Sequence, residues 1–172
     1  MGIFAFGDRI PKIGEGSYVF ETATVVGDVT LGKDVYVGPG AVVRGDYGNI
    51  VIGDRTSIEE NVVIHARPDD RTLIGKDVTI GHGSVIHNCR IDDFAVIGMG
   101  SVVSDFAHVK RWGVVAEGAM VKGEVPEDTI VAGIPAKPIK EITEEFRELW
   151  SYYKTIYPDL AHRYPRELRR ID

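Results

Sequence analysis

The sequence predicts an all-β fold, a parallel β-helix of hexapeptide repeats wound as a triangular prism, followed by a C-terminal α-helix. Two observations predict it. Aliphatic residues recur every six positions through most of the chain, and the 20 glycines among 172 residues exceed the average content of about 7%. A period of six fits neither a helix nor one long strand, but it fits short strands joined by regular turns.

The repeat has one aliphatic residue in each hexad. A small or β-branched residue usually follows four positions later, and the two side chains together fill the narrow interior. Glycine, Asn or Asp at the corners supplies the positive φ angles of the turns. Three hexads complete one coil, so the 18 hexads predict about six coils within residues 1–138. The aliphatic positions are Ile13, Val19, Val25, Leu31, Val37, Val43, Ile52, Ile58, Ile64, Ile74, Ile80, Ile86, Ile91, Ile97, Val103, Val109, Val115 and Val121.

Residues 139–172 have a different pattern, that of an amphipathic helix and a tail. Thr143 is a suitable N-cap, and Pro158 should break or kink the helix near Tyr157. We expect this helix to pack on the β-helix and cover its end or side, as repeat arrays require. The apolar residues at helical spacing are Ile142, Phe146, Leu149, Tyr153, Ile156 and Leu160.

Composition excludes several function classes. The net charge is −6, with 20 Lys and Arg against 26 Asp and Glu, so a nucleic-acid partner is not expected. No apolar stretch approaches the roughly 20 residues of a membrane-spanning helix, and the first residues lack a secretory signal pattern. A single cysteine, Cys89, is compatible with a reducing compartment. We therefore expect a cytoplasmic protein.

The histidines fall on the prism in an informative way. If the breaks in the repeat bulge outward at corners, four hexads stack on one face, and the outward residues that follow their aliphatic positions are Arg44, His65, His87 and Ser104. Adjacent coils lie about 4.8 Å apart. His65 and His87 are therefore close enough to bind one metal ion at about 2.0–2.1 Å.

A third histidine, His82, lies one hexad earlier on a different face, in a column with Glu60 and Met99. It cannot easily reach round the prism, but a neighbouring subunit related by a threefold axis could supply it. The pattern therefore predicts a three-histidine site between subunits of a homotrimer. Three neutral imidazoles on Zn²⁺ leave a position open for water, whose pKa the metal lowers from 15.7 to about 7.

Three segments resemble the γ-class carbonic anhydrases and their relatives: Val43-Arg-Gly-Asp46, the run from Ile52 to His65, and Ile80-Gly-His-Gly-Ser-Val-Ile-His87. The similarity runs through essentially the whole chain. It implies a left-handed β-helix, a homotrimer, and metal ligands at His65, His82 and His87. The metal it implies is Zn²⁺, with Fe²⁺ or Co²⁺ as alternatives.

The resemblance also implies roles for other residues. Arg44 and Asp46 match an arginine and an aspartate of the family, and the arginine forms an intersubunit ion pair with the acid matched by Glu60. Tyr157 matches a tyrosine that many relatives contribute from the C-terminal helix. The sequence departs from the family at Glu59, where glutamine is usual, and at Glu60, where aspartate is common. Glutamine can donate or accept a hydrogen bond, whereas an ionised Glu59 only accepts.

Three functions follow from these features. The first is a carbonic anhydrase, a lyase that converts CO₂ to bicarbonate by metal-bound hydroxide. Arg44, Asp46, Glu59 and Glu60 would organise water and interface, and Tyr157 would lie near the site. The second is a metal-binding trimer that is catalytically silent or hydrolyses another substrate. The third is a coenzyme A-dependent acyltransferase, although such an enzyme needs one histidine base and not a stacked pair plus a third.

Overall fold

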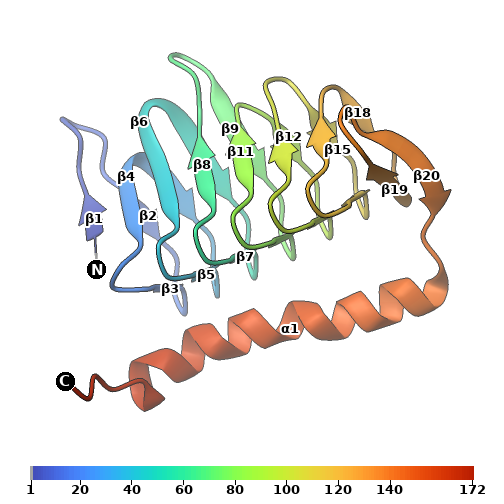
Figure 1. Ribbon diagram of the computed structural model, residues 1–172. Coiled ribbons are helices and arrows are strands. Elements are labelled where there is room, and N and C mark those ends of the chain that lie inside the picture. Colours follow the sequence, from blue (N-terminus) through green and yellow to red (C-terminus); the bar gives the residue numbers. More distant parts are fainter. Residues whose placement is uncertain (1) are drawn as a thin grey trace.

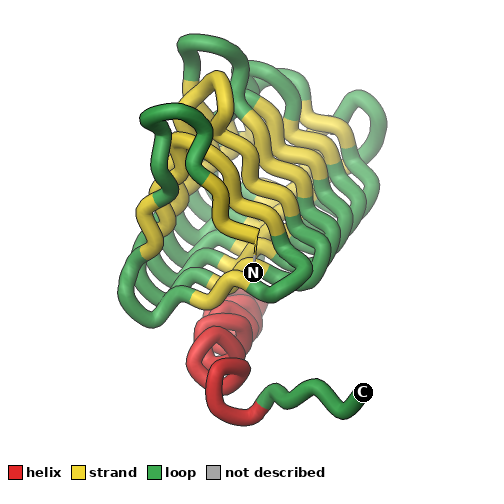
Figure 2. Tube along the Cα trace, turned by 90° about the vertical axis from the view of Figure 1, so that its left-hand side faces the viewer, coloured by secondary structure: helices red, strands yellow, loops and turns green. Residues whose placement is uncertain are grey.

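The computed structural model describes residues 2–172, which form a β-solenoid and one long helix (Figure 1). The solenoid is a left-handed parallel β-helix with three faces, as the repeat and the resemblance predict. Its coils stack one behind another, and the helix lies beneath one face (Figure 2). Among the described residues, no helix is long and apolar enough to span a membrane.

Faces 1 and 2 belong to one continuous sheet, because two long strands pass round the corner between them. These are β4 (Thr24–Leu31) and β6 (Val42–Ile52), which pair in parallel along both faces. Face 1 also contains β1 (Gly2–Phe4), β8 (Val63–His65), β11 (Val85–His87), β14 (Val102–Val103) and β17 (Met120–Val121). Face 2 also contains β2 (Lys12–Ile13), β9 (Arg71–Ile74), β12 (Arg90–Ile91), β15 (His108–Val109) and β18 (Glu124–Val125).

Face 3 is a separate sheet in which seven successive coils each place one parallel strand. An antiparallel strand that no periodicity in the sequence predicts, β20, pairs with the last of them. The strands are β3 (Tyr18–Val19), β5 (Tyr36–Val37), β7 (Ser57–Ile58), β10 (Thr79–Ile80), β13 (Val96–Ile97), β16 (Val114–Val115), β19 (Thr129–Ala132) and β20 (Lys137–Glu141). The prediction of about six coils is therefore one too few, because a coil continues through Val125 and Val131 after a shortened interval.

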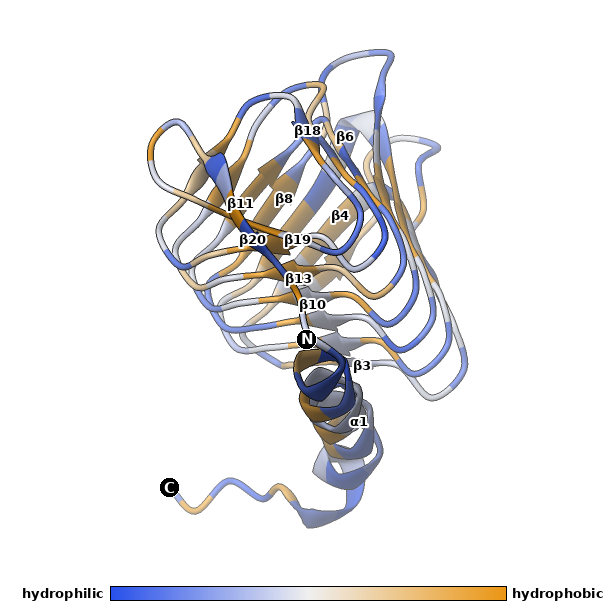
Figure 3. Cartoon of the chain, turned by 90° about the vertical axis from the view of Figure 1, so that its right-hand side faces the viewer, coloured by the Kyte–Doolittle hydropathy of each residue, from blue (hydrophilic) through white to orange (hydrophobic). Residues whose placement is uncertain are grey.

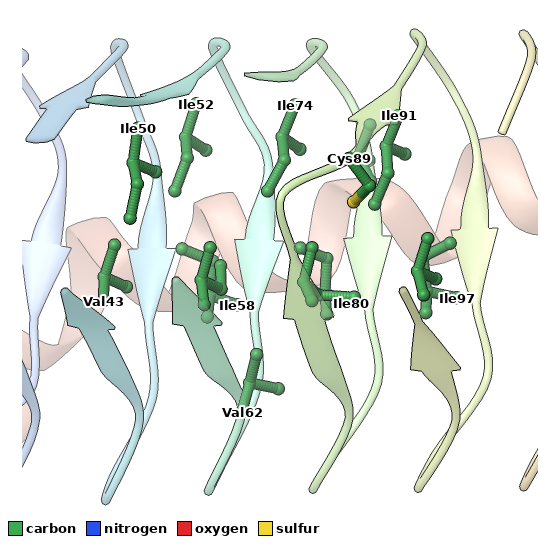
Figure 4. Packing of buried hydrophobic residues seen from close by; sticks show 14 of the residues in the cluster. Val43, Ile50, Ile52, Ile58, Val62, Ile74, Ile80, Cys89, Ile91 and Ile97 are labelled. Atoms are coloured by element: carbon green, nitrogen blue, oxygen red, sulfur yellow. The ribbon is translucent and has the colours of Figure 1, made fainter. Parts of the chain in front are cut away.

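The interior is filled as the repeat predicts. Figure 4 shows Ile58, Ile80 and Ile97 stacked in one row, one residue per coil, and they are almost completely buried. Burial of each such side chain stabilises the fold by about 1.5–3 kcal/mol. Hydrophobic and hydrophilic stretches alternate along the coils (Figure 3), and the aliphatic residues of the repeat in the inner coils are buried.

The breaks in the repeat fall at one corner, between faces 1 and 2. Val43 pairs with Ile64 on face 1, and Ile52 pairs with Ile74 on face 2, although the two intervals differ in length. The extra residues of these two coils therefore bulge outward. The hexads keep their faces here and also after the shortened interval from Ile86 to Ile91, since Ile91 pairs with Ile74.

Helix α1 (Glu144–Glu167) runs back along face 3 toward the N-terminal coils (Figure 1). Thr143 caps it, since its side chain accepts a hydrogen bond from the amide of Phe146 at 3.2 Å. Phe146 and Trp150 pack on Val96 and Val114 of face 3. The prediction of a break or kink near Tyr157 differs from the structure, in which the helix is continuous through Pro158 and Pro165.

Packing explains why the helix continues past Pro158. A proline removes one backbone hydrogen bond. Beyond it, Ala161 is buried against the solenoid, and the ring of Tyr164 meets those of Tyr18 and Phe20 at centroid distances of 5.4 and 5.9 Å. These contacts offset the lost bond and hold the last turns helical.

Candidate metal centre

The register of face 1 stacks the histidines as the repeat predicts. Arg44 pairs with His65 between β6 and β8, and His65 pairs with His87 between β8 and β11. In each strand the preceding aliphatic residue points into the core, so the next side chain points outward. His65 and His87 are therefore neighbours on the outer surface of one chain.

The two imidazoles approach each other through one nitrogen each. Nδ1 of His65 lies 3.2 Å from Nε2 of His87. Two imidazole nitrogens bound to a tetrahedral zinc ion at about 2.0–2.1 Å lie roughly 3.3 Å apart. The pair therefore fits two adjacent coordination positions of such an ion, and His65 and His87 are the residues that could hold it.

Carboxylates occupy the opposite side of both rings. Nε2 of His65 lies 3.1 Å from Oδ1 of Asp46, and Nδ1 of His87 contacts Oδ1 of Asp105. Asp46 also forms an ion pair with Arg44. Burial opposes ionisation of Asp46, but hydrogen bonds from Arg44 and His65 outweigh it, so that the pKa of this carboxyl is lowered.

His82 lies elsewhere, at the corner that follows β10. Its Nε2 is 3.0 Å from Oε2 of Glu59, and its Nδ1 is 2.5 Å from Oε2 of Glu60. The structure of one chain therefore does not bring His82 to His65 and His87. Among the described residues, no group of three or more His, Cys, Asp or Glu is arranged to hold a metal ion by itself.

Glu59 and Tyr157 lie together on the helix side of His82. Glu59 is buried and accepts a hydrogen bond from the amide of His82 at 3.2 Å. Burial raises the pKa of Glu59, while the neighbouring His82 and a hydrogen bond from the Tyr157 hydroxyl act in the opposite direction. Burial, with the charges of Glu59 and Glu60, raises the pKa of Tyr157.

A cavity of about 610 Å³ opens beside these residues, between α1 and face 3. Glu59, His82 and Tyr157 line one part of it. The rest of the wall is mostly apolar, with Ile97 on the solenoid and Trp150 on the helix. Tyr157 is thus close to Glu59 and His82 within one chain.

Sequence reasoning missed three residues. Tyr36 is fully buried, and its hydroxyl donates a hydrogen bond to Oε1 of Glu60 at 3.1 Å. Asp105 accepts from His87, and Arg67 donates to Asp105 at 3.0 Å. The column argument contained a signal for Asp105, since it immediately follows Ser104, the outward residue stacked next to His87. Arg67 lies in a corner bulge, where the repeat predicts no side-chain direction.

Comparison with known proteins agrees with this architecture. A family model described as bacterial transferase hexapeptide (six repeats) matches residues 10–45 and 71–105. A crystal structure of a hexapeptide transferase family protein from Anaplasma phagocytophilum superposes with a TM-score of 0.90 at 32% identity, covering 95% of this chain and 98% of that one. The fold thus defines a hexapeptide-repeat β-helix protein.

Two relatives indicate to which family of hexapeptide-repeat proteins the chain belongs. The mitochondrial gamma carbonic anhydrase 2 of Arabidopsis thaliana is 36% identical over 80% of this chain, and the carnitine operon protein CaiE of Escherichia coli is 34% identical over 95% of it. The matched region spans 52% of the first relative and 84% of the second. The chain belongs to the γ-carbonic-anhydrase-like hexapeptide-repeat family.

Proposed function

We propose that this protein is a metal-dependent γ-class carbonic anhydrase that interconverts CO₂ and bicarbonate at sites between the subunits of a homotrimer. The observation that carries the proposal is the pair of imidazole nitrogens, 3.2 Å apart, that His65 and His87 direct at one point. His82 of a neighbouring subunit would be the third ligand. Zn²⁺ suits this ligand set, and Fe²⁺ or Co²⁺ is compatible with it.

Apolar side chains support assembly at this surface. Val63 and Val85 begin the strands that end at His65 and His87 on face 1, and their exposed fractions are 40% and 39%. Met99, next to His82 in its column, is 51% exposed. Both halves of the proposed site therefore carry exposed apolar residues, as a surface that is covered by another subunit would.

The surrounding residues have separable roles in this proposal. A bound zinc ion would supply a water molecule of lowered pKa, near 7, as nucleophile. Glu59 would accept a hydrogen bond from that water, Tyr157 donates a hydrogen bond to Glu59, and the apolar wall of the cavity suits uncharged CO₂. Arg44 offers its planar guanidinium to bicarbonate or to Glu60 of a neighbouring subunit, and Asp46 orients it.

Acyl transfer is the second candidate, because the matching family model and the Anaplasma protein are both described as transferases. An acyltransferase would need one histidine as a base and a binding surface for coenzyme A. The convergent histidine pair is better explained by a metal. A metal-loaded trimer that acts on another substrate, or on none, is the outcome to expect if loaded protein does not hydrate CO₂.

Stopped-flow CO₂ hydration by protein of known metal content tests the proposal. We expect CO₂ hydration by the metal-loaded wild type. Mutating a residue that hydrogen-bonds to a metal ligand typically costs about 10–100-fold in activity, so His87→Ala, which removes a ligand itself, should lose at least that much. His108→Ala is the matched control, because His108 lies on face 2 and pairs with Asp92 at 2.7 Å. Full metal occupancy without hydration would refute the activity, and His87→Ala with unchanged metal content would refute the site.

A further inference from the structure

Each of the two stacked histidines has its own aspartate and arginine. Asp46 shares its carboxylate between His65 and Arg44. On the other side of the histidine pair, Asp105 shares its carboxylate between His87 and Arg67. These are two His–Asp–Arg hydrogen-bond relays. The second one contains Asp105 and Arg67, to which neither the repeat nor the family resemblance assigns a role.

The carboxylate of Asp105 is fixed through both oxygens. Oδ1 accepts the hydrogen bond from Nδ1 of His87, and Oδ2 accepts one from Nη1 of Arg67 at 3.0 Å. Arg67 is itself held, because its guanidinium carbon lies 5.7 Å from the ring centroid of Phe106. Its backbone amide donates to Oδ1 of Asn88 at 3.0 Å.

This arrangement determines which nitrogen of His87 carries the proton. An ionised carboxylate only accepts hydrogen bonds, so Nδ1 must donate and Nε2 keeps its lone pair. That lone pair faces Nδ1 of His65, whose other nitrogen contacts Asp46 in the same way. Two lone pairs directed at one point repel each other unless a cation lies between them, which makes the pair a prepared ligand set.

We infer that Asp105, held by Arg67, is a positioning residue that fixes the Nδ1-protonated tautomer of His87 and thereby presents Nε2 as a metal ligand. The inference rests on the proposed function in assigning His87 as a ligand. Carboxylates behind metal-bound histidines typically orient the ring and raise its basicity. Asp105 is thus proposed to act on metal affinity through His87, without touching the metal.

Zn²⁺ affinity of the full-length protein, measured by competition with a chromophoric chelator, is the first test. We expect Asp105→Ala to bind Zn²⁺ about 10–100-fold more weakly than wild type. Asp105→Asn keeps the shape and a hydrogen-bond acceptor but removes the charge, so its loss should be smaller. Asp92→Ala is the matched control, because it removes the carboxylate from the His108–Asp92 pair on face 2 and should leave Zn²⁺ affinity unchanged.

Long-range ¹H–¹⁵N NMR of histidine-labelled, metal-free protein is the second test. It reads the tautomer directly and needs neither metal nor activity. We expect His87 to be protonated at Nδ1 in wild type and in Asp92→Ala. In Asp105→Ala this preference should be lost, while the spectra of residues elsewhere on the solenoid stay unchanged and show that the fold is intact.

The outcomes separate the inference from the proposed function. If wild type binds Zn²⁺ but Asp105→Ala binds it equally well and keeps the tautomer, the role of Asp105 is refuted and the metal site stands. If wild type binds no metal while the tautomer depends on Asp105, the metal site fails and only the hydrogen-bond relay stands. An equal loss of affinity in Asp92→Ala would make the effect non-specific and would also refute the inference.

Discussion

Lys154 places a cationic group in an almost completely buried environment on the inner side of α1. Its Nζ donates to the carbonyl of Ala95 at 3.0 Å and to the hydroxyl of Thr79 at 3.3 Å. It also lies 5.8 Å from the ring centroids of Trp112 and Trp150. Burial lowers the pKa of Lys154 to about 7, although the charges of Asp77 and Glu59 act in the opposite direction.

This lysine makes stability depend on pH. In the unfolded chain its pKa is about 10.4, so between about pH 7 and 10.4 the unfolded state binds one more proton than the folded state. Stability should therefore rise with pH across this window, by up to about 1.4 kcal/mol per pH unit. Lys154→Met should remove that slope and be more stable than wild type near pH 7, as measured by urea unfolding at fixed protein concentration.

The control is Lys140→Met on β20, where the replaced side chain is exposed. It removes the same charge without removing a buried one, so its unfolding free energy should follow that of wild type with pH. Parallel pH profiles for wild type and Lys154→Met would contradict the burial argument.

Residue positions were predictable from the sequence where the six-residue period controls them. The period places His65 next to His87 because each follows a buried aliphatic residue on the same face. It says nothing of Arg67, whose direction depends on the conformation of a corner bulge. The role of His82 is a prediction of a different kind, because the sequence predicts it only by way of a threefold axis, and within one chain His82 contacts Glu59 and Glu60 instead.

At the scale of elements, the docking of α1 depends on a few aromatic side chains. Trp150 packs on the face 3 residues Val96 and Val114, and it lines the cavity beside His82. Trp150→Ala should lower stability by about 1–3 kcal/mol, because partly buried apolar area is lost, and should speed hydrogen exchange along the helix.

Leu149→Ala provides the comparison for this helix. Leu149 is the preceding residue on α1 and is 49% exposed, so its truncation should change both quantities little. Equal effects of the two substitutions would contradict the proposed docking face. The helix also shows why a break at Pro158 was wrongly predicted. That prediction considers only the backbone hydrogen bond that a proline removes, whereas contacts of Ala161 and Tyr164 with the solenoid keep the helix continuous.

For the whole molecule, the repeat predicts the fold because one pattern determines the interior of every coil. Its last coil was missed because Val125 follows Val121 after four residues, and β20 was missed because it caps the solenoid without repeating. Similarity to relatives shows the family, but the 3.2 Å approach of Nδ1 of His65 to Nε2 of His87 is a property of the folded chain.

The central claim, that each metal site is shared between subunits, is tested most directly by mixing two variants. His82→Ala and His87→Ala should each be inactive as pure trimers. Refolded together in equal amounts, they form interfaces in which intact His82 from one chain meets intact His65 and His87 from the other. Random assembly of a cyclic trimer restores about a quarter of the sites. Recovery of about a quarter of the wild-type Zn²⁺ content and CO₂ hydration is the expected result. No recovery in trimers proven to be mixed would contradict a site shared between subunits.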